Sequence, residues 1–494
     1  MTMNSVTRGK ASTPDDEMPE RTSRRFDSRT RHLVEAPITR TLVRLAVPNV
    51  LVMVAQASVG LIETFFVGRL GTDALAGVAL VFPTLMLMQM MSAGAMGGGI
   101  SSAIARALGA GRRAEADALA LHALAIAVLF GLAFTAAVLA GGSWLYGVMG
   151  GTGASITAAR TYSNVVFAGA VLLWLFNSLA NIIRGTGNMA VPAIVNCMGA
   201  AVLIPLSPCL IFGWGPFPRL GIAGGAIAVI AFYALESLAL VSYLLSSRSL
   251  IRLSLRGFAF RWSLFREILR VGAVAALITV GTNVTMAVAT ALIGQFGPAA
   301  VAGYGTGSRI EYLLIPLVFG LGGPLVAMVG TNIGADEPGR ALRSAWIGAA
   351  IAAGLCEIIG LAAAAFPHLW LSLFDDNAAM LDVGSRYLRT VGPFYGLFGL
   401  GMALYFASQG AGRLAWPLIA NLTRLTIAAV GGSVALRLSG NLGDVFFGLA
   451  IALAVFGVIN AAAVAGGAWF GPVRLRSLPP LRRKDNVHIR TSIA

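Results

Sequence analysis

Long apolar stretches separated by short polar segments run from about residue 45 to residue 469. A helix of about 20 apolar residues is long enough to cross the ~30 Å hydrocarbon core of a bilayer. Strands of a membrane β-barrel would instead alternate strictly over about 10 residues, and the sequence has no such pattern. We therefore predict an all-α polytopic membrane protein with twelve transmembrane helices, at 45–68, 74–100, 118–141, 161–183, 189–212, 222–246, 268–294, 299–328, 345–366, 387–408, 414–436 and 445–469.

Basic residues are unevenly distributed between these spans. Most of the 36 Lys and Arg residues lie before residue 45, in the loops after the even-numbered spans, or after residue 469. The positive-inside rule places such segments on the cytoplasmic side, so we expect a multi-pass membrane protein with both termini in the cytoplasm. Topology and anionic membrane lipid then account for the net charge of +15, and nucleic acid is not an expected partner.

The composition narrows the functional classes further. Charged residues make up 12% of the chain, against about 25% in soluble domains. The sequence lacks the Gly-Lys-Ser/Thr ending of a P-loop, and the spans hold no HExxH motif or Ser/His arrangement, so an ATP-driven pump or an enzyme is disfavoured. Cys197, Cys209 and Cys356 lie inside spans without CxxC spacing, and the histidines form no ligand pair, so we expect no disulfide, metal site or cofactor.

The two halves of the chain match at an almost constant offset in residue number. Adding 226 to the residue number places 67–71 (VGRLG) on 293–297 (IGQFG), and adding 225 places Gly185-Thr186-Gly187 on Gly410-Ala411-Gly412. With the second offset Pro192 and Asn196 fall on Pro417 and Asn421. One register held across several spans indicates an internal repeat, and hence two six-helix bundles related by a pseudo-twofold axis along the membrane normal.

This repeat divides the chain into five segments. We expect a disordered basic cytoplasmic tail at 1–40, an N-terminal bundle at 41–246, a cytoplasmic linker at 247–267, a C-terminal bundle at 268–469 and a second basic tail at 470–494. Basic and apolar residues alternate along the linker, which favours an interfacial helix on anionic lipid; a solvated connecting loop is the alternative. Two bundles beside a central opening suit alternating access, because one can rock against the other.

Four glutamates lie inside predicted spans: Glu63, Glu236, Glu311 and Glu357. A carboxylate at mid-bilayer costs about 3 kcal/mol on insertion scales, so each is a functional candidate. Desolvation favours the protonated form of a carboxyl group and hydration favours release of the proton, which is what coupling requires. We assign proton or cation coupling to Glu63, Glu236 and Glu311, and regard Glu357 as a link between helices. The repeat counterpart of Glu63 is Ala289, so this acid is present in one half only.

Other polar and aromatic residues in the spans are candidates for a substrate cavity. Asn177 and Asn181 share one helix face, which either lines a polar cavity or bonds to a neighbouring helix. The two intramembrane arginines are expected to pair with acids such as Glu311. Aromatic rings could contact planar cations, although apolar packing is the commoner role. The candidate cavity residues are Gln56, Trp174, Asn177, Asn181, Asn196, Asn283, Arg309 and Arg424.

Three segments together resemble the multidrug and toxin extrusion (MATE) family, in particular its DinF-like branch. They are LIETFFVGRLGTDALAGVAL at 61–80, RGTGNMAVPAIVN at 184–196 and GYGTGSRIEYLLIPLVFGLG at 303–322. The resemblance implies a V-shaped pair of bundles that exports organic, often cationic, compounds in exchange for H⁺ or Na⁺. The family's first-span acid matches Glu63, although aspartate is usual there.

The chain departs from the family pattern elsewhere. The fifth-span Asn-x-x-x-Asp-Pro motif falls on residues 203–208, where this chain has Leu203 and Ser207, and a seventh-span acid falls on Asn283. Because Na⁺ prefers several oxygen ligands, a single Glu63 with neutral neighbours favours H⁺. We therefore predict a monomeric H⁺-coupled exporter of small organic cations. A lipid-linked precursor flippase of the same superfamily is the alternative, and a transport-inactive scaffold or sensor remains open.

Overall fold

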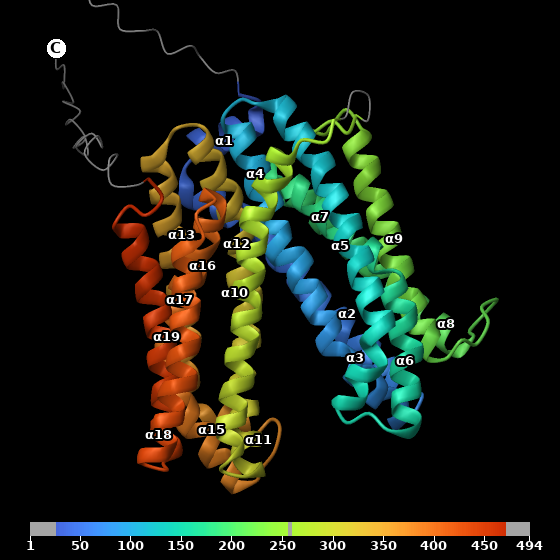
Figure 1. Ribbon diagram of the computed structural model, residues 1–494, viewed down its shortest axis with the longest axis vertical. Helices are drawn as coiled ribbons and strands as arrows, with labels where there is room; N and C mark the ends of the chain where they lie inside the picture. The colour runs from blue at the N-terminus through green and yellow to red at the C-terminus, as the bar shows by residue number, and fades with distance from the viewer. Residues whose placement is uncertain (1–25, 255–258, 471–494) are drawn as a thin grey trace, which may run out of the picture.

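The computed structural model describes residues 26–254 and 259–470, and the described chain is almost entirely helical (Figure 1). A short helix, α1, precedes two groups of long helices. The N-terminal bundle contains a π-helical segment, Met90–Met96, which joins α3 to α4. The helices up to the linker are α1 (Ser28–Glu35), α2 (Ile38–Gly68), α3 (Thr72–Gln89), α4 (Gly97–Gly109), α5 (Arg113–Val148), α6 (Gly153–Ala168), α7 (Ala170–Gly185), α8 (Ala190–Phe212) and α9 (Ile222–Leu245).

The C-terminal bundle repeats this order with more interruptions. A 3₁₀ turn, Gly392–Phe394, separates α15 from α16, and a π-helical segment, Ile427–Gly431, separates α17 from α18. Its helices are α10 (Trp262–Gly294), α11 (Pro298–Ser308), α12 (Glu311–Gly334), α13 (Pro338–Ala365), α14 (Pro367–Leu371), α15 (Ala378–Val391), α16 (Tyr395–Ala411), α17 (Ala415–Thr426), α18 (Gly432–Leu438) and α19 (Leu442–Ala465).

The membrane spans agree with the hydrophobic pattern. Within the described residues, eleven helices are long and apolar enough to cross a bilayer, and the count becomes twelve when α6 and α7, bent by 48°, form one span. The prediction of an all-α polytopic membrane protein is confirmed. The predicted spans 161–183 and 299–328 are divided, the first at Gly169 between α6 and α7 and the second after Ser308 between α11 and α12.

Reciprocal glycine contacts reveal the symmetry between the halves. A Cβ atom on Gly109 would lie 2.1 Å from the carbonyl oxygen of Thr331, and one on Gly334 would lie 2.1 Å from that of Arg106. Gly109 and Gly334 are repeat partners, and so are Arg106 and Thr331, because both pairs share the second repeat offset. The two contacts are therefore one contact seen from each half, which places the pseudo-twofold axis between α4 and α12.

The bundles meet at one end of the molecule and diverge towards the other, giving a V shape (Figure 1). We call the end that contains α1, the end of α4 and the end of α12 the closed end. Here Arg106 Nη2 lies 3.0 Å from Glu267 Oε1, and the Ser102 hydroxyl donates to the Gln409 carbonyl oxygen at 2.6 Å. Gln409 Nε2 in turn donates to the Gly94 carbonyl oxygen at 3.2 Å. Each of these bonds joins one bundle to the other.

The expected disordered tail of residues 1–40 is corrected in part. Residues 1–25 lie outside the described residues, but α1 begins at Ser28, where the Asp27 side chain accepts from the Arg29 and Thr30 amides. The Leu33 carbonyl oxygen accepts from Asn332 Nδ2 at 3.3 Å, and Arg29 Nη1 donates to the Tyr243 hydroxyl at 3.2 Å. Contacts with both bundles thus order α1. The second expected tail lies outside the described residues from 471 onward.

The expected interfacial helix in the linker is wrong for the described residues. Residues 247–254 and 259–261 contain no helix, and α10 begins at Trp262. The backbone amides of this loop bond instead to side chains of α5: Arg252 N donates to Asp117 Oδ1 at 2.8 Å, and Arg261 N donates to His122 Nε2 at 2.9 Å. Bonds to α5 replace the intrahelical bonds that a helix would need.

Candidate functional site

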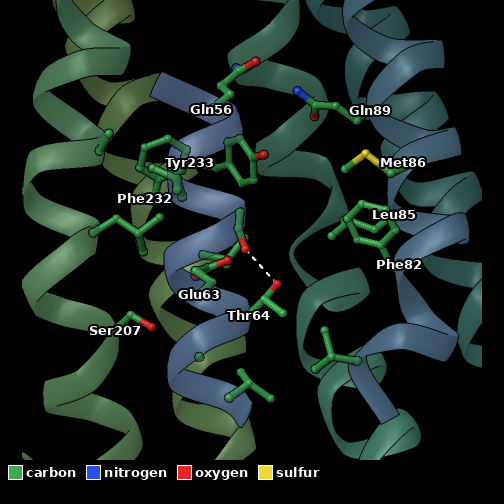
Figure 2. A pocket seen from close by; sticks show the side chains of 18 of the residues that line it. Gln56, Glu63, Thr64, Phe82, Leu85, Met86, Gln89, Ser207, Phe232 and Tyr233 are labelled. Carbon is green, nitrogen blue, oxygen red and sulfur yellow. Dashed lines mark hydrogen bonds between the residues drawn. The ribbon is translucent and has the colours of Figure 1, made fainter. Parts of the chain in front are cut away.

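A cavity of about 430 Å³ lies within the N-terminal bundle (Figure 2). Helices α2, α3, α8 and α9 supply most of its wall, and Tyr162 of α6 closes one side. Gln56 and Glu63, seven residues apart, are two turns apart on one face of α2, so both reach the cavity. In Figure 2 the amides of Gln56 and Gln89 lie at one end of the cavity, and Glu63 and Ser207 lie towards the other.

The Glu63 carboxyl group has an unsatisfied oxygen. Glu63 Oε1 is buried and has no hydrogen-bond partner among the described residues. The adjacent Thr64 hydroxyl donates to the Gly60 carbonyl oxygen of the same helix at 2.8 Å, the dashed line in Figure 2, and not to Glu63. Buried polar atoms nearly always have a partner, so an unpaired oxygen facing a cavity is suited to holding a proton or a ligand donor.

A second glutamate lies directly behind the cavity wall. Asn196, which lines the cavity, donates from Nδ2 to Glu236 Oε1 at 2.9 Å. Glu236 is 1% exposed, and its other oxygen has no partner among the described residues. Three predicted site residues, Gln56, Glu63 and Asn196, thus line one cavity, and one hydrogen bond links Glu236 to it.

The rest of the wall is neutral and largely apolar, and it includes four aromatic residues. Among the described lining residues, Glu63 is the one carboxylic acid, and none is Lys, Arg or His. The prediction missed most of the residues that line this cavity. Neither an aromatic nor a polar residue in a transmembrane helix carries a local signal that separates a cavity wall from a packed core. The missed residues include Phe82, Gln89, Tyr162, Ser207, Phe232 and Tyr233.

Three other candidates on α7 take part in helix packing. Asn177 Nδ2 donates to the Ser92 hydroxyl at 2.8 Å, and Asn181 Nδ2 donates to the Ala93 carbonyl oxygen at 3.3 Å. These bonds hold α7 against the π-helical segment. Of the two roles considered for this face, they agree with bonding to a neighbouring helix. Trp174 is fully buried and stacks on Phe130, with ring centroids 5.3 Å apart.

The remaining candidates lie in the C-terminal bundle. Asn283 is exposed and donates to the Thr279 carbonyl oxygen, and Arg309 is exposed with its guanidinium 5.3 Å from the centre of the Phe374 ring. Glu311 and Arg424 line a second, smaller cavity of about 30 Å³. Of the two arginines expected to pair with Glu311, Arg424 lines the same cavity, and the pairing itself stays a prediction.

Glu357, the fourth glutamate, has a backbone partner. Its Oε2 atom accepts from the Gly396 amide at 2.7 Å. Gly396 lies in the first turn of α16, where amides have no intrahelical acceptor. Glu357 therefore joins α13 to the start of α16, as expected for a glutamate that links helices.

Comparison with known proteins agrees with this geometry. The MatE family model matches residues 48–209 and 275–434, one segment in each half and together more than half of the chain. The chain belongs to the MATE family of efflux transporters. It is a transporter and not an enzyme, and the predicted family is confirmed. The two matched segments correspond to the two bundles.

Individual relatives cover most of the chain. The FAD transporter of Shewanella oneidensis is 31% identical over 408 residues, covering 80% of this chain and 87% of the relative. The probable multidrug resistance protein NorM of Thermotoga maritima is 26% identical over 388 residues, covering 77% and 82%. The structure is similar, at a TM-score of 0.79 and 25% identity, to an outward-facing multidrug resistance MATE family transporter, covering 90% of this chain and 99% of that one.

Proposed function

We propose that this transporter exports small organic cations in exchange for protons, and that both bind in the N-terminal cavity. The observation that carries the proposal is the Glu63 carboxyl group, whose buried oxygen is unpaired in an otherwise neutral cavity. The volume of about 430 Å³ lies within the range of about 300–1,000 Å³ of small-molecule sites. Aromatic walls favour planar or lipophilic cations.

The lining favours H⁺ over Na⁺ as the coupling ion. Hard metal cations take several oxygen ligands, with carboxylates among them. Here Ser207 stands where the family motif has an acid, and the described lining contains no second carboxylate. A proton needs only one carboxyl group. One charge crossing ~100 mV supplies about 2.3 kcal/mol, enough for roughly 40-fold accumulation of substrate per proton.

We propose further that the closed end faces the cytoplasm of a bacterial inner membrane. The described segments at this end are rich in arginine, including Arg106, Arg112, Arg113, Arg340 and Arg343, as the positive-inside rule requires. The splayed bundles then open outward, a state compatible with release of substrate. A green fluorescent protein fused to residue 494 should fluoresce and an alkaline phosphatase fusion should be inactive; the reverse result would contradict this orientation.

A second candidate substrate comes from the FAD transporter of Shewanella oneidensis, which is 31% identical. Stacking on Phe82, Phe232 or Tyr233 would suit a flavin ring. FAD also carries a pyrophosphate, and anionic phosphates are bound chiefly by Arg and Lys. The described lining of the N-terminal cavity contains neither residue, so its chemistry favours a cationic substrate. FAD is therefore supported by sequence similarity and not by the charge of the cavity.

Proteoliposomes with a controlled pH gradient would test both candidates. Ethidium transport should depend on the gradient and disappear with an uncoupler. Glu63→Gln should abolish gradient-driven transport, whereas the matched change Glu357→Gln should not, because a glutamine can still accept from the Gly396 amide. Unchanged proton-driven transport by Glu63→Gln would refute the coupling role. Transport of FAD without transport of ethidium would establish the second candidate instead.

A further inference from the structure

The small cavity of the C-terminal bundle is the repeat counterpart of the large one. Its volume is about 30 Å³, against about 430 Å³ in the N-terminal bundle. Under the two repeat offsets, residues that line the large cavity correspond to residues that line the small one. Val59, Glu63, Val78 and Leu85 fall on Thr285, Ala289, Tyr304 and Glu311, and Tyr162 falls on Tyr387.

The small cavity is lined by an arginine whose repeat counterpart is a glycine. Arg424 lines the small cavity, and its repeat counterpart in the N-terminal bundle is Gly199, which has no side chain. Gly199 neighbours Ala200 in the wall of the large cavity. A Cβ atom on Gly199 would lie 2.8 Å from the Phe232 ring and 2.9 Å from Glu236 Oε1, so in the N-terminal bundle these two side chains occupy the space beside the glycine.

The guanidinium of Arg424 is held like a bound cation. Arg424 is 6% exposed, and its guanidinium carbon lies 5.6 Å from the centre of the Phe398 ring and 5.8 Å from that of Phe456. Both separations are within the range of cation–π attraction. Aromatic faces and burial are the features with which proteins recognise free organic cations.

An acid faces this guanidinium from the same cavity. The Glu311 carboxylate accepts from the Tyr387 hydroxyl at 2.9 Å and lines the same cavity as Arg424. The counterpart of Glu311 is Leu85, while that of Glu63 is Ala289. Among the described lining residues, each cavity thus has one acid, on different helices, and only the C-terminal cavity has an arginine.

We infer that Arg424 is a built-in cation that occupies the C-terminal cavity, so that this bundle takes no cation from solution. Removing the guanidinium should leave a site for a small organic monocation of the guanidinium type, formed by Glu311 and the rings of Phe398 and Phe456. The inference concerns charge pairing inside one bundle and does not depend on the substrate of the N-terminal cavity.

Thermal unfolding of the purified, detergent-solubilised protein tests this inference without a transport assay. Arg424→Ala should lower the unfolding midpoint, because it leaves the half-buried Glu311 without a neighbouring positive charge. Millimolar methylguanidinium should raise the midpoint of Arg424→Ala towards that of the wild type, and should leave the wild type unchanged. Urea, which has a similar shape and no charge, should not replace it. Arg309→Ala, a change at an exposed arginine, should not respond to methylguanidinium.

The double variant Arg424→Ala/Glu311→Gln separates charge from packing. It should be more stable than Arg424→Ala alone and insensitive to methylguanidinium, since neither of the two charges at the cavity remains. A methylguanidinium response equal in the single and double variants, or absent from both, would overturn the inference. If Arg424→Ala does not accumulate but the double variant does, charge pairing is supported. If neither accumulates, Arg424 acts through packing and the inference fails.

Discussion

The glycine pair at the closed end provides a test of both the symmetry and the conformational cycle. Gly109→Ala would place a methyl group 2.1 Å from the Thr331 carbonyl oxygen, and Gly334→Ala would place one 2.1 Å from that of Arg106. Ordinary C···O contacts are about 3.3 Å or longer. The opposing atoms belong to the backbone and cannot rotate away, so α4 and α12 must separate by about 1 Å.

The expected size of the effect follows from this overlap. Overpacking of a close interface costs about 1–3 kcal/mol. The clash exists only while the closed end is shut, so it should shift the equilibrium towards states in which this end is open. At about 1.4 kcal/mol per tenfold change, the ratio of the two states should shift by roughly 5- to 140-fold. Because the contacts are repeat partners, Gly109→Ala and Gly334→Ala should have similar effects.

Spin labels across the closed end would measure this shift. Residues 112 and 337 are exposed and lie on opposite bundles, so cysteines there, with the native cysteines replaced, can carry the labels. Either glycine variant should add a longer component to the distance distribution. Gly339→Ala is the control, because its added Cβ would meet nothing within 4 Å. Unchanged distances in both variants, or a change in only one, would refute the reciprocal contact.

Three further substitutions probe the charged groups. Glu267→Gln should change the ratio of open to closed states by less than roughly fivefold in the same label assay, because its ion pair with Arg106 is partly exposed. An effect larger than that of the glycine variants would contradict this ranking. Arg340→Gln should speed hydrogen exchange in α1 about tenfold or more, since Arg340 donates to the Leu33 and Ala36 carbonyl oxygens, and unchanged exchange would exclude that anchoring. Glu357→Ala should lower the unfolding midpoint more than Glu357→Gln does, and equal midpoints would argue against the bond to Gly396.

The repeat explains why much of the architecture was predictable from the sequence. The repeat offset pairs Gly109 with Gly334, and these two residues meet reciprocally in the structure. Glu63 and Gln56 were also accessible to sequence reasoning, because polar residues two turns apart mark one face of an otherwise apolar helix. Both features depend on periodicity, which the sequence records directly.

Other features depend on what packs against each helix. Asn181 and Asn196 look alike in sequence, yet Asn181 bonds to the π-helical segment and Asn196 lines the cavity. A polar residue in a span predicts that its side chain avoids lipid, but not which internal surface it meets. The linker is a similar case, because its amides bond to Asp117 and His122, side chains that lie far from it in the sequence.

The two bundles combine a symmetric frame with asymmetric chemistry. The residues that set the helix packing, such as Gly109 and Gly334, are the same in both halves, so the bundles can move as matched bodies. The charged residues at the cavities are not repeated: Glu63 lines the large cavity, while its counterpart Ala289 lines the small one together with Arg424. A frame with two equivalent open acidic cavities would bind cations independently in each bundle. On the proposed function, an arginine held in one of them would confine the uptake and release of cations to the other, where a single carboxyl group, Glu63, would couple the proton to the substrate.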